Sequence, residues 1–456
     1  MTHIFHRSPK TPPVIAARGQ GSHIYTADGA KFFDGSGGAA VSCLGHAHPE
    51  VIEAVVQQMH KLEYAHTGFF SSEPAERLAD LLVQHSPSNL NHVYFLSSGS
   101  EAIETALKMA RQYHVERGEP SRRHTIARKL SYHGNTLGAL AIGGHVGRRA
   151  LYQPLLVQGH HVSPCFARHY RLSGESDEEY GTRLASELEQ LILTLGPDTV
   201  STFIAETVVG ATAGAIAPVP GYFRKIRQVC DRFGVVLILD EVMCGVGRTG
   251  SYHAFEQEDV LPDLLTMAKG LGGGYQPIAA VMASDRLVDT IVAGSGAFQH
   301  GHTYVGHPVA CAAALAVQTI IHRDQLVQRS ADMGHYLADR LRERFLDHPH
   351  VSDIRGRGLF QAIELVASRE TDSPFDPALQ LHARIKKQAQ QFGLLCYPGG
   401  GTIDGVNGDH VLLAPPYISS KAELDTAVDV LAKSLDTVLA GLNASGVHAV
   451  AQSSLK

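Results

Sequence analysis

The sequence predicts an α/β fold with a mostly parallel sheet, followed by a smaller α+β region. Short apolar segments alternate with longer amphipathic segments through the middle of the chain, which is typical of a parallel sheet with helices on both faces. One segment, residues 235–239, is an unbroken apolar run rich in β-branched residues, as expected for a strand buried on both faces. After about residue 348 the strands and helices follow a different order, which indicates the second region.

The composition is that of a globular protein. The chain has 456 residues, 44% of them apolar, and a formal charge of −6. This charge leaves no polybasic surface, so neither nucleic acid nor an anionic membrane is an expected partner. The sequence contains no run of 18 apolar residues, and its first residues lack the apolar core of a signal peptide. We therefore expect a cytoplasmic enzyme.

Cysteine and histidine do not indicate a metal centre. The six cysteines lie far apart without a CxxC pair, so the sequence predicts neither a disulfide framework nor a thiolate zinc site. The 27 histidines cluster in several places but form no HExxH motif. We expect surface and turn histidines and no bound metal.

The first third of the chain begins with strands and continues with helices. Short strands on either side of the turn at Asp28-Gly29 are expected within residues 12–34. Apolar residues at helical spacing predict a helix over 49–61, and a second helix is predicted over 74–85. A strand at 93–96 then leads into a helix that ends near residue 116.

The pattern continues as strand and helix to about residue 283. Strands are predicted at 125–128, 202–205 and 278–283, and helices at 178–195 and 221–233. Residues 140–180 are rich in loop-forming residues, and the sequence does not order them.

The C-terminal third begins with a long Ala-rich helical region from residue 308 to about 348, interrupted near 323–324. Strands are predicted at 359–366, 394–397 and 411–413. Ser420 and Glu423 match a capping box, which predicts the start of the last helix.

Polar residues stand at the carboxyl ends of the predicted strands, which is where open α/β sheets bind ligands. Asp240 and Glu241 follow the run 235–239, and Lys269 follows a second apolar run and precedes a glycine-rich turn. Ser98, Gly99 and Ser100 lie at a helix start, where free N–H groups and the helix dipole favour a phosphate. Ser98 with Glu101 could alternatively be a simple helix cap. Tyr132, at another strand end, could stack on a planar ring.

Two interpretations of this region compete. Gly245, Gly247 and Gly250 have the G-x-G-x-x-G spacing of a dinucleotide-binding loop, but there the acid follows the glycines, whereas here the acids precede them. A phosphate cradle, an aromatic face, an acid and a lysine together describe a pyridoxal 5′-phosphate site instead. The lysine binds the cofactor aldehyde, and a carboxylate such as Asp240 keeps the pyridine nitrogen protonated.

Several motifs in order resemble those of the class III aminotransferases, which are pyridoxal-phosphate enzymes of fold type I. The resemblance extends over nearly the whole chain. Its most specific part is the segment 240–250 followed by Ala268-Lys269-Gly270-Leu271; the segments 98–102, 132–134 and 301–308 also match. It implies a large cofactor-binding domain over residues 51–305 and a smaller domain built from both termini, residues 1–50 and 306–456.

The resemblance also implies roles for single residues. Lys269 would form a Schiff base with the cofactor, and Asp240 would pair with the pyridine nitrogen. Val242 and Tyr132 would cover the two ring faces, and His133 follows Tyr132 in the same motif. Ser98, Gly99 and Ser100 would hold the phosphate, and Glu206 would lie near the 3′-hydroxyl. Thr303 would reach the phosphate of a neighbouring subunit, which implies a homodimer with shared active sites, or a tetramer of such dimers.

Two departures concern the backbone and the substrate. Family members commonly have Glu-Pro-Val where this chain has Glu206-Thr207-Val208. They also bind a substrate carboxylate with an arginine in or near the segment that corresponds to residues 394–417, and this segment contains no arginine or lysine here. Arg355 and Arg357 are possible substitutes, although a structural role in a turn is the plainer interpretation.

These observations predict a ping-pong aminotransferase. The donor would be an amine, a diamine or an ω-amino acid whose reacting carbon bears no carboxylate, and the acceptor an oxo acid such as pyruvate or 2-oxoglutarate. Two alternatives stay open at this point. One is a racemase or aminomutase on the same fold, and the other is a non-catalytic protein that binds the cofactor for regulation.

Overall fold

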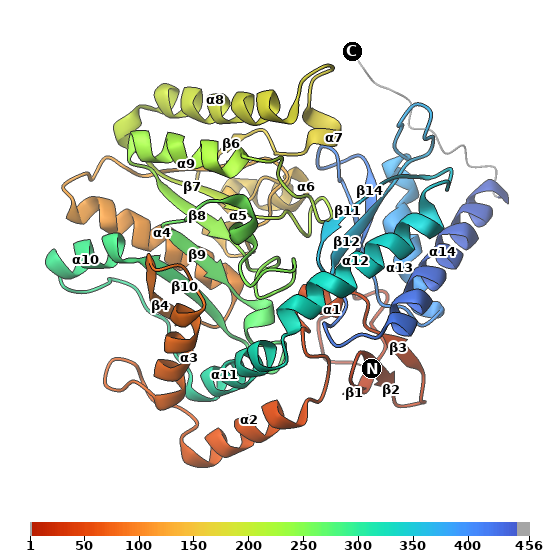
Figure 1. Ribbon diagram of the computed structural model, residues 1–456, viewed down its shortest axis with the longest axis horizontal. Coiled ribbons are helices and arrows are strands. Elements are labelled where there is room, and N and C mark those ends of the chain that lie inside the picture. The colour runs from red at the N-terminus through yellow and green to blue at the C-terminus, as the bar shows by residue number, and fades with distance from the viewer. Residues whose placement is uncertain (1, 445–456) are drawn as a thin grey trace.

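The computed structural model describes residues 2–444 and confirms the α/β fold (Figure 1). A seven-stranded sheet in the order β4-β10-β9-β8-β7-β5-β6 forms its centre. All neighbouring strands are parallel except β10, which runs antiparallel to both β4 and β9. The strands are β4 Leu90–Leu96, β5 His124–Arg128, β6 His160–Val162, β7 Val200–Glu206, β8 Val236–Asp240, β9 Leu264–Met267 and β10 Ala279–Ser284.

Helices cover both faces of this sheet, as the apolar strands require. Along β8, Leu237 and Leu239 pack into one apolar cluster while Val236 and Ile238 pack into another, because successive side chains of a strand point to opposite faces. One face contacts α4 Gly99–Glu116, α5 Leu137–Ile142 and α10 Asp285–Ala293; the other contacts α3 Glu73–Gln84, α8 Asp177–Leu195 and α9 Tyr222–Phe233.

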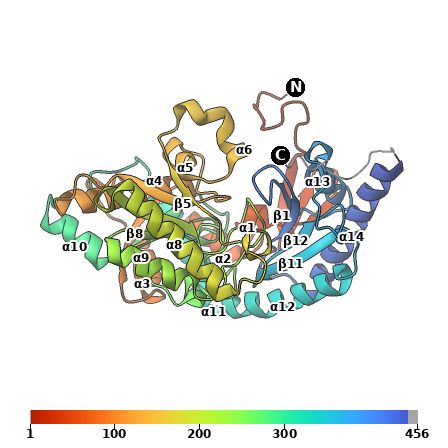
Figure 2. The same cartoon turned by 90° about the horizontal axis from the view of Figure 1, so that it is seen from above.

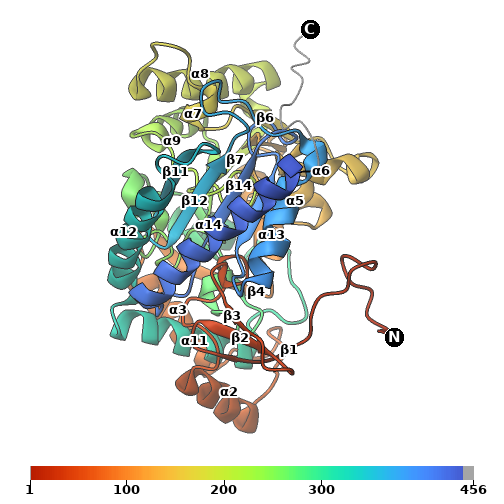
Figure 3. The same ribbon diagram turned by 90° about the vertical axis from the view of Figure 1, so that its right-hand side faces the viewer.

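The C-terminal region is built on a separate antiparallel sheet, with the order β11-β12-β14-β13. Two helices, α12 and α13, contact its strands, and a third, α14, packs on both of these helices; Figure 3 shows α14 crossing in front of this sheet. The strands are β11 Val351–Arg357, β12 Phe360–Leu365, β13 Tyr397–Gly400 and β14 Asp409–Leu413. The helices are α12 Leu326–Phe345, α13 Leu381–Gln391 and α14 Lys421–Ala444. The predicted capping box is present, since Ser420 Oγ accepts from Glu423 N and Glu423 accepts from Ser420 N.

The N-terminal strands form a small three-stranded sheet that joins the C-terminal region by main-chain hydrogen bonds. Phe33 N donates to Gly393 O at 2.8 Å, and Ala414 N donates to Gly35 O at 2.8 Å. The elements are β1 Ala16–Gln20, β2 His23–Thr26, β3 Lys31–Phe33 and the short helix α1 Gly37–Ala40.

Two long helices connect the regions. Helix α2, Pro49–Lys61, begins with a proline and ends with His60 and Lys61, as helix termini favour. Helix α11, Pro308–Arg323, packs on both α2 and α3. The domain boundaries at 50/51 and 305/306 therefore stay a prediction, because α11 follows the second boundary yet contacts helices that precede it.

The elements differ from the prediction at four places. Residues 140–180 contain α6 Val146–Arg149, η1 Ala150–Leu155, the edge strand β6 and α7 Ala167–Tyr170. Strand β11 was not predicted, β13 begins three residues later than expected, and β10 is antiparallel. The remaining short helices are η2 Pro197–Thr199, η3 Ala254–Glu258, η4 Lys269–Leu271 and η5 Pro377–Leu379. No helix within residues 2–444 is long and apolar enough to cross a membrane.

Candidate active site

A cavity of about 390 Å³ lies where β7, β8 and β9 end. Its size is within the roughly 300–1,000 Å³ that is typical of small-molecule sites. The pairing register brings the strand ends together, since Glu206 is opposite Asp240 and Asp240 is opposite Thr266. Predicted site residues that line the cavity are Ser98, Gly99, Ser100, Tyr132, His133, Glu206, Asp240, Val242 and Lys269.

Asp240 is held in place by several donors. One carboxylate oxygen accepts from Val242 N at 3.0 Å and from Thr266 Oγ1 at 3.3 Å. The other oxygen is 2.8 Å from Nδ1 of His133, and both side chains are buried. Nε2 of His133 is buried with no hydrogen-bond partner within residues 2–444. Asp240 thus presents a fixed, hydrogen-bonded carboxylate in the cavity.

Lys269 begins the turn after β9 and lies close to these acids. Its backbone has φ +47°, in the left-handed region that side chains other than glycine rarely adopt. Burial lowers the pKa of its amine to about 8, although Asp240 and Glu206 act in the opposite direction. No residue in the described range 2–444 forms a hydrogen bond to Nζ, so the amine is available to a ligand.

Glu206 occupies the end of β7 and is buried. Its carboxyl accepts from Tyr132 N at 3.2 Å and from Gly210 N at 3.3 Å. Burial raises its pKa, with Asp240 adding to the effect and His133 opposing it. Glu206 therefore fixes the backbone at Tyr132 as well as facing the cavity.

The N-terminus of α4 closes another side of the cavity. Ser98 is the helix cap that was one of its two interpretations, because its Oγ accepts from Glu101 N at 3.2 Å. The N–H groups of Gly99 and Ser100 stand at helix positions that have no internal acceptor. A Cβ on Gly99 would lie 2.9 Å from Val242 Cγ1, so glycine is required for this close approach.

Tyr132 and Val242 are both partly buried, and they come from different strand ends. Val242 packs against the apolar cluster beneath α4. The ring of Tyr132 has the guanidinium of Arg148 4.8 Å from its centroid. Both side chains line the cavity with apolar surface that a planar ligand could contact.

Glu241 and the glycine-rich loop 245–250 make structural contacts and do not line the cavity. Glu241 accepts from the N–H groups of Ala254 and Phe255, both at 2.7 Å, and so anchors η3. Arg248 is buried and donates to Leu359 O and Pro415 O, which ties the loop to the C-terminal region. The loop opens no helix, so the dinucleotide interpretation is wrong.

Thr303 does not line the cavity. It is exposed, and its carbonyl accepts from Tyr64 Oη at 3.0 Å. Its predicted contact with a neighbouring subunit stays a prediction.

Comparison with known proteins identifies the family. A family model described as aminotransferase class-III matches residues 4–435. An uncharacterized aminotransferase of Schizosaccharomyces pombe is 48% identical over 441 residues, which cover 96% of each chain. The chain belongs to the class III aminotransferases. A gamma aminobutyrate transaminase of Solanum lycopersicum is also similar, with 36% identity over 93% of this chain and 91% of its own.

Solved structures of the same kind share the fold. The omega transaminase of Pseudomonas jessenii in complex with PMP superposes with a TM-score of 0.90 at 33% identity, covering 98% of this chain and 97% of its own. This class III aminotransferase is therefore a fold type I enzyme that transfers amino groups, and pyridoxal phosphate is its cofactor. The racemase, aminomutase and regulatory alternatives are set aside.

The residues that line the cavity of this class III aminotransferase fit pyridoxal phosphate. It contains the amine of Lys269, with a pKa of about 8, and the hydrogen-bonded carboxylate of Asp240. It also contains the free N–H groups at the start of α4, where Gly99 has no side chain to obstruct a ligand. The buried and unpaired Nε2 of His133 is a further polar group that a ligand could satisfy.

The two departures from the family pattern have visible consequences. Thr207 donates its hydroxyl to Glu241 at 2.9 Å, and its N–H, which proline would lack, lies 3.4 Å from Asp240 O. Arg355 and Arg357 are not free to bind a substrate. Arg355 lies in β11, not in a turn, and donates to Gly214 O, Ala213 O, Asp353 and Glu364. Arg357 donates to Glu258.

Sequence reasoning missed several residues of the cavity. Val41 comes from the N-terminal segment, and Gln276, Pro277 and Ile278 come from the turn before β10. None of these residues follows the carboxyl end of a predicted strand or belongs to a motif, although Ile278 begins the strand predicted at 278–283, so the sequence offered no reason to place them at the site. Gly274, which ends the glycine-rich turn after Lys269, also lines the cavity and is the noted residue closest in sequence to Gln276.

Proposed function

We propose that this aminotransferase takes the amino group of an amine, a diamine or an ω-amino acid and passes it to pyruvate or 2-oxoglutarate in a ping-pong cycle. The observation that carries the donor class is the absence of arginine and lysine from residues 394–417, together with the engagement of Arg355 and Arg357 by structural partners. The named relatives, a gamma aminobutyrate transaminase and an omega transaminase, support the same donor class.

In this proposal each predicted residue has one task. Gly99 and Ser100, with Ser98, hold the phosphate of pyridoxal phosphate at the start of α4. Tyr132 and Val242 cover its ring, His133 supports Asp240, and Glu206 lies on the side of its 3′-hydroxyl. When bound, the cofactor supplies a ring that withdraws electrons from the reacting carbon.

Lys269 and Asp240 handle the protons. Lys269 Nζ takes a proton from the reacting carbon of the donor and later returns one, which a pKa near neutrality favours. Asp240 would accept a hydrogen bond from the protonated pyridine nitrogen. Its three hydrogen-bonded neighbours, Val242, Thr266 and His133, keep it oriented for that task.

The proposal includes a homodimer in which Thr303 reaches the phosphate of the neighbouring subunit. The exposure of Thr303 supports this, as do the exposed apolar residues Phe69, Phe70 and Tyr304. A cytoplasmic location is also proposed, and the six unpaired cysteines are consistent with a reducing compartment.

The experiment uses the purified enzyme with its cofactor and no acceptor. Amines, diamines, ω-amino acids and α-amino acids are added one at a time, and the visible absorption of the bound cofactor is followed. Loss of absorption with the first three groups, restored by pyruvate or 2-oxoglutarate, supports the proposal. A response to α-amino acids alone would contradict it. The Lys269→Ala variant serves as the control that should not respond.

A further inference from the structure

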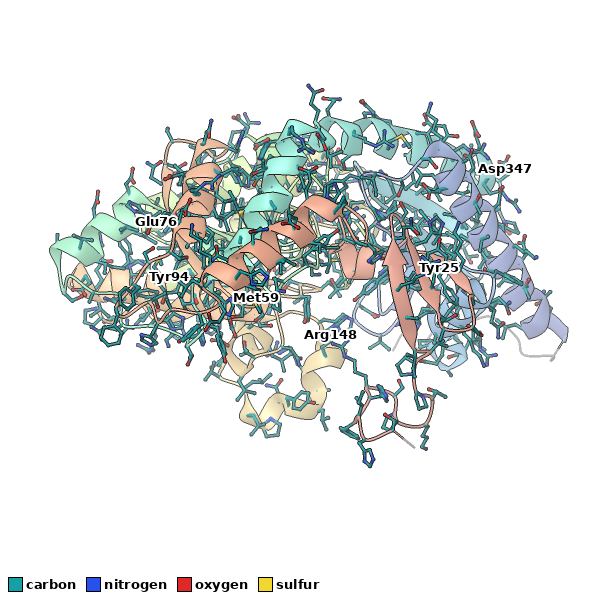
Figure 4. All side chains as sticks on the ribbon, turned by 90° about the horizontal axis from the view of Figure 1, so that it is seen from below. Tyr25, Met59, Glu76, Tyr94, Arg148 and Asp347 are labelled. Atoms are coloured by element: carbon teal, nitrogen blue, oxygen red, sulfur yellow. The ribbon has the colours of Figure 1, made fainter. Side chains whose placement is uncertain are left out.

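The site described so far has no group that binds a carboxylate of the acceptor. Arg148, in the short helix α6, stands beside it. Its guanidinium lies 4.8 Å from the ring centroid of Tyr132, which lines the cavity. Figure 4 labels Arg148 near the middle of the molecule, where α6 approaches the body of the fold.

The side chain of Arg148 is exposed to solvent. Within residues 2–444 its guanidinium has no hydrogen-bonded or ion-paired acceptor, unlike Arg355 and Arg357. The neighbouring Arg149 is partly buried, and its charge helps to lower the pKa of His161. A free guanidinium offers a planar pair of donors, which is the arrangement that carboxylates accept.

Helix α6 packs against the segment that lacks arginine. A Cβ on Gly405 would lie 3.5 Å from Val146 N, and one on Gly147 would lie 3.6 Å from Gly405 O. Tyr170 Oη donates to Ile403 O at 2.8 Å, which holds the same loop from α7. The loop 401–408 belongs to the run 394–417 that contains no arginine or lysine, so Arg148 brings a cation to this part of the molecule from another element.

The charges around Arg148 agree with this role. Asp240 and Glu206 make the strand ends acidic, so an incoming carboxylate needs a cation on the side away from them. Arg148 is close enough to influence the pKa of Lys269 and of Tyr132, and it lowers both. Arg7 also acts on Tyr132, and Figure 2 shows the N-terminal segment and α6 on the same side of the molecule.

We propose that Arg148 is the specificity-determining residue that binds the carboxylate of the oxo-acid acceptor, or the distal carboxylate of an ω-amino acid donor, beside Tyr132. A donor without a carboxylate leaves the exposed guanidinium in water at little cost. One site can in this way accept both an amine and an oxo acid. The inference rests on the proposed function for its substrates, but its own binding test does not need turnover.

The first measurement is the binding of glutarate, a dicarboxylate without an amino or oxo group, to the cofactor-loaded enzyme by calorimetry. Arg148→Gln should weaken glutarate about 10- to 100-fold, as the loss of a charged hydrogen bond does. Arg148→Lys should recover part of the affinity, since the charge stays and the paired donors are lost. The matched control is Arg123→Gln, an exposed arginine that precedes β5 at the opposite end of the strand.

The second measurement compares Michaelis constants. Arg148→Gln should raise KM for pyruvate and 2-oxoglutarate by a similar factor and leave KM for a carboxylate-free amine within about twofold. Unchanged glutarate binding in Arg148→Gln would overturn the inference, as would a loss found in Arg7→Gln instead. If the wild type ignores carboxylate-free amines, the proposed donor class fails, while the glutarate titration still decides the role of Arg148.

Discussion

Two regions meet at the cavity, and they are built differently. The sheet region, formed by the ends of β7, β8 and β9 and the start of α4, is largely buried, and its two carboxylates already have partners. Asp240 has three hydrogen-bonded neighbours and Glu206 has two. The α6 region, formed by α6 and the loop 401–408, is a short helix on a glycine-rich loop, and its Arg148 is exposed and unpaired.

This difference is expected because one region performs the chemistry and the other meets the variable ends of the two substrates. The chemistry of the two half-reactions is the same, so the groups that perform it gain from being fixed in advance. The two substrates differ, so the region that meets their variable ends gains from a group that can be solvated or paired in turn. Substitutions in the two regions should therefore have different effects on turnover and on substrate affinity.

Lys269→Ala should reduce transamination by more than about 10³-fold, because it removes both the covalent attachment and the proton carrier. Steady-state turnover with the best donor measures this. Circular dichroism should show an unchanged fold. If turnover persists within about tenfold of the wild type, the chemistry does not reside in the sheet region.

Asp240→Asn should lower kcat about 10²- to 10³-fold, because the neutral amide no longer stabilises positive charge at the ring nitrogen. Its shape is kept, so cofactor content, measured after gel filtration, should stay close to that of the wild type. A variant that changed only KM would place Asp240 with the substrate-binding groups and break the contrast.

Arg355→Gln should destabilise the fold by about 3 kcal/mol without changing KM for the acceptor, because it removes the arginine from a buried ion pair and leaves Glu364 with His169 and the more distant Arg168. Burial would raise the pKa of Glu364, but Arg355 and His169 outweigh it and hold the pKa at about 2, below its ordinary 4.5. The stabilisation is therefore present above pH 4.5 and lost as pH falls toward 2.

Denaturant unfolding at pH 7 and pH 3 measures the effect of this variant. The difference from the wild type should be smaller at pH 3. A raised KM for pyruvate in Arg355→Gln would show instead that Arg355 leaves its structural partners to bind substrate.

The smallest effect concerns pH. Uptake of pyridoxal phosphate by the cofactor-free enzyme should accelerate about tenfold between pH 7 and 9, with an apparent pKa near 8, because the neutral amine of Lys269 reacts. Stopped-flow absorbance measures the rate. Asp240→Asn should move the midpoint to lower pH, since Asp240 raises the pKa of Lys269. A midpoint near 10 would mean that Lys269 is not desolvated.

The sheet region could be predicted from the sequence almost completely. Asp240 and Lys269 each follow a buried apolar run, and the parallel register necessarily gathers such strand ends at one edge. The α6 region could not be predicted, because Arg148 lies in a stretch without periodicity, and its position depends on packing against the loop 401–408, far along the chain. The reversal of β10 was hidden as well, since an apolar strand reads the same in either direction.

Local signals were also ambiguous where tertiary contacts decide the outcome. Asp240 and Glu241 are adjacent acids that both follow the same buried strand in the sequence. In the structure Asp240 lines the cavity, whereas Glu241 anchors η3. Ser98 could be a cap or a phosphate ligand, and the structure shows the cap, while its hydroxyl proton is still free to be donated.

The left-handed backbone at Lys269 has a consequence for engineering. A side chain in this conformation costs on the order of 1 kcal/mol, and the residue that would relieve the strain is glycine, which has no amine. At this position the backbone strain and the catalytic amine therefore come together, so a change that relieved the strain would remove the activity of the enzyme. Efforts to raise its melting temperature should leave this turn alone and look to exposed helices such as α2 and α8.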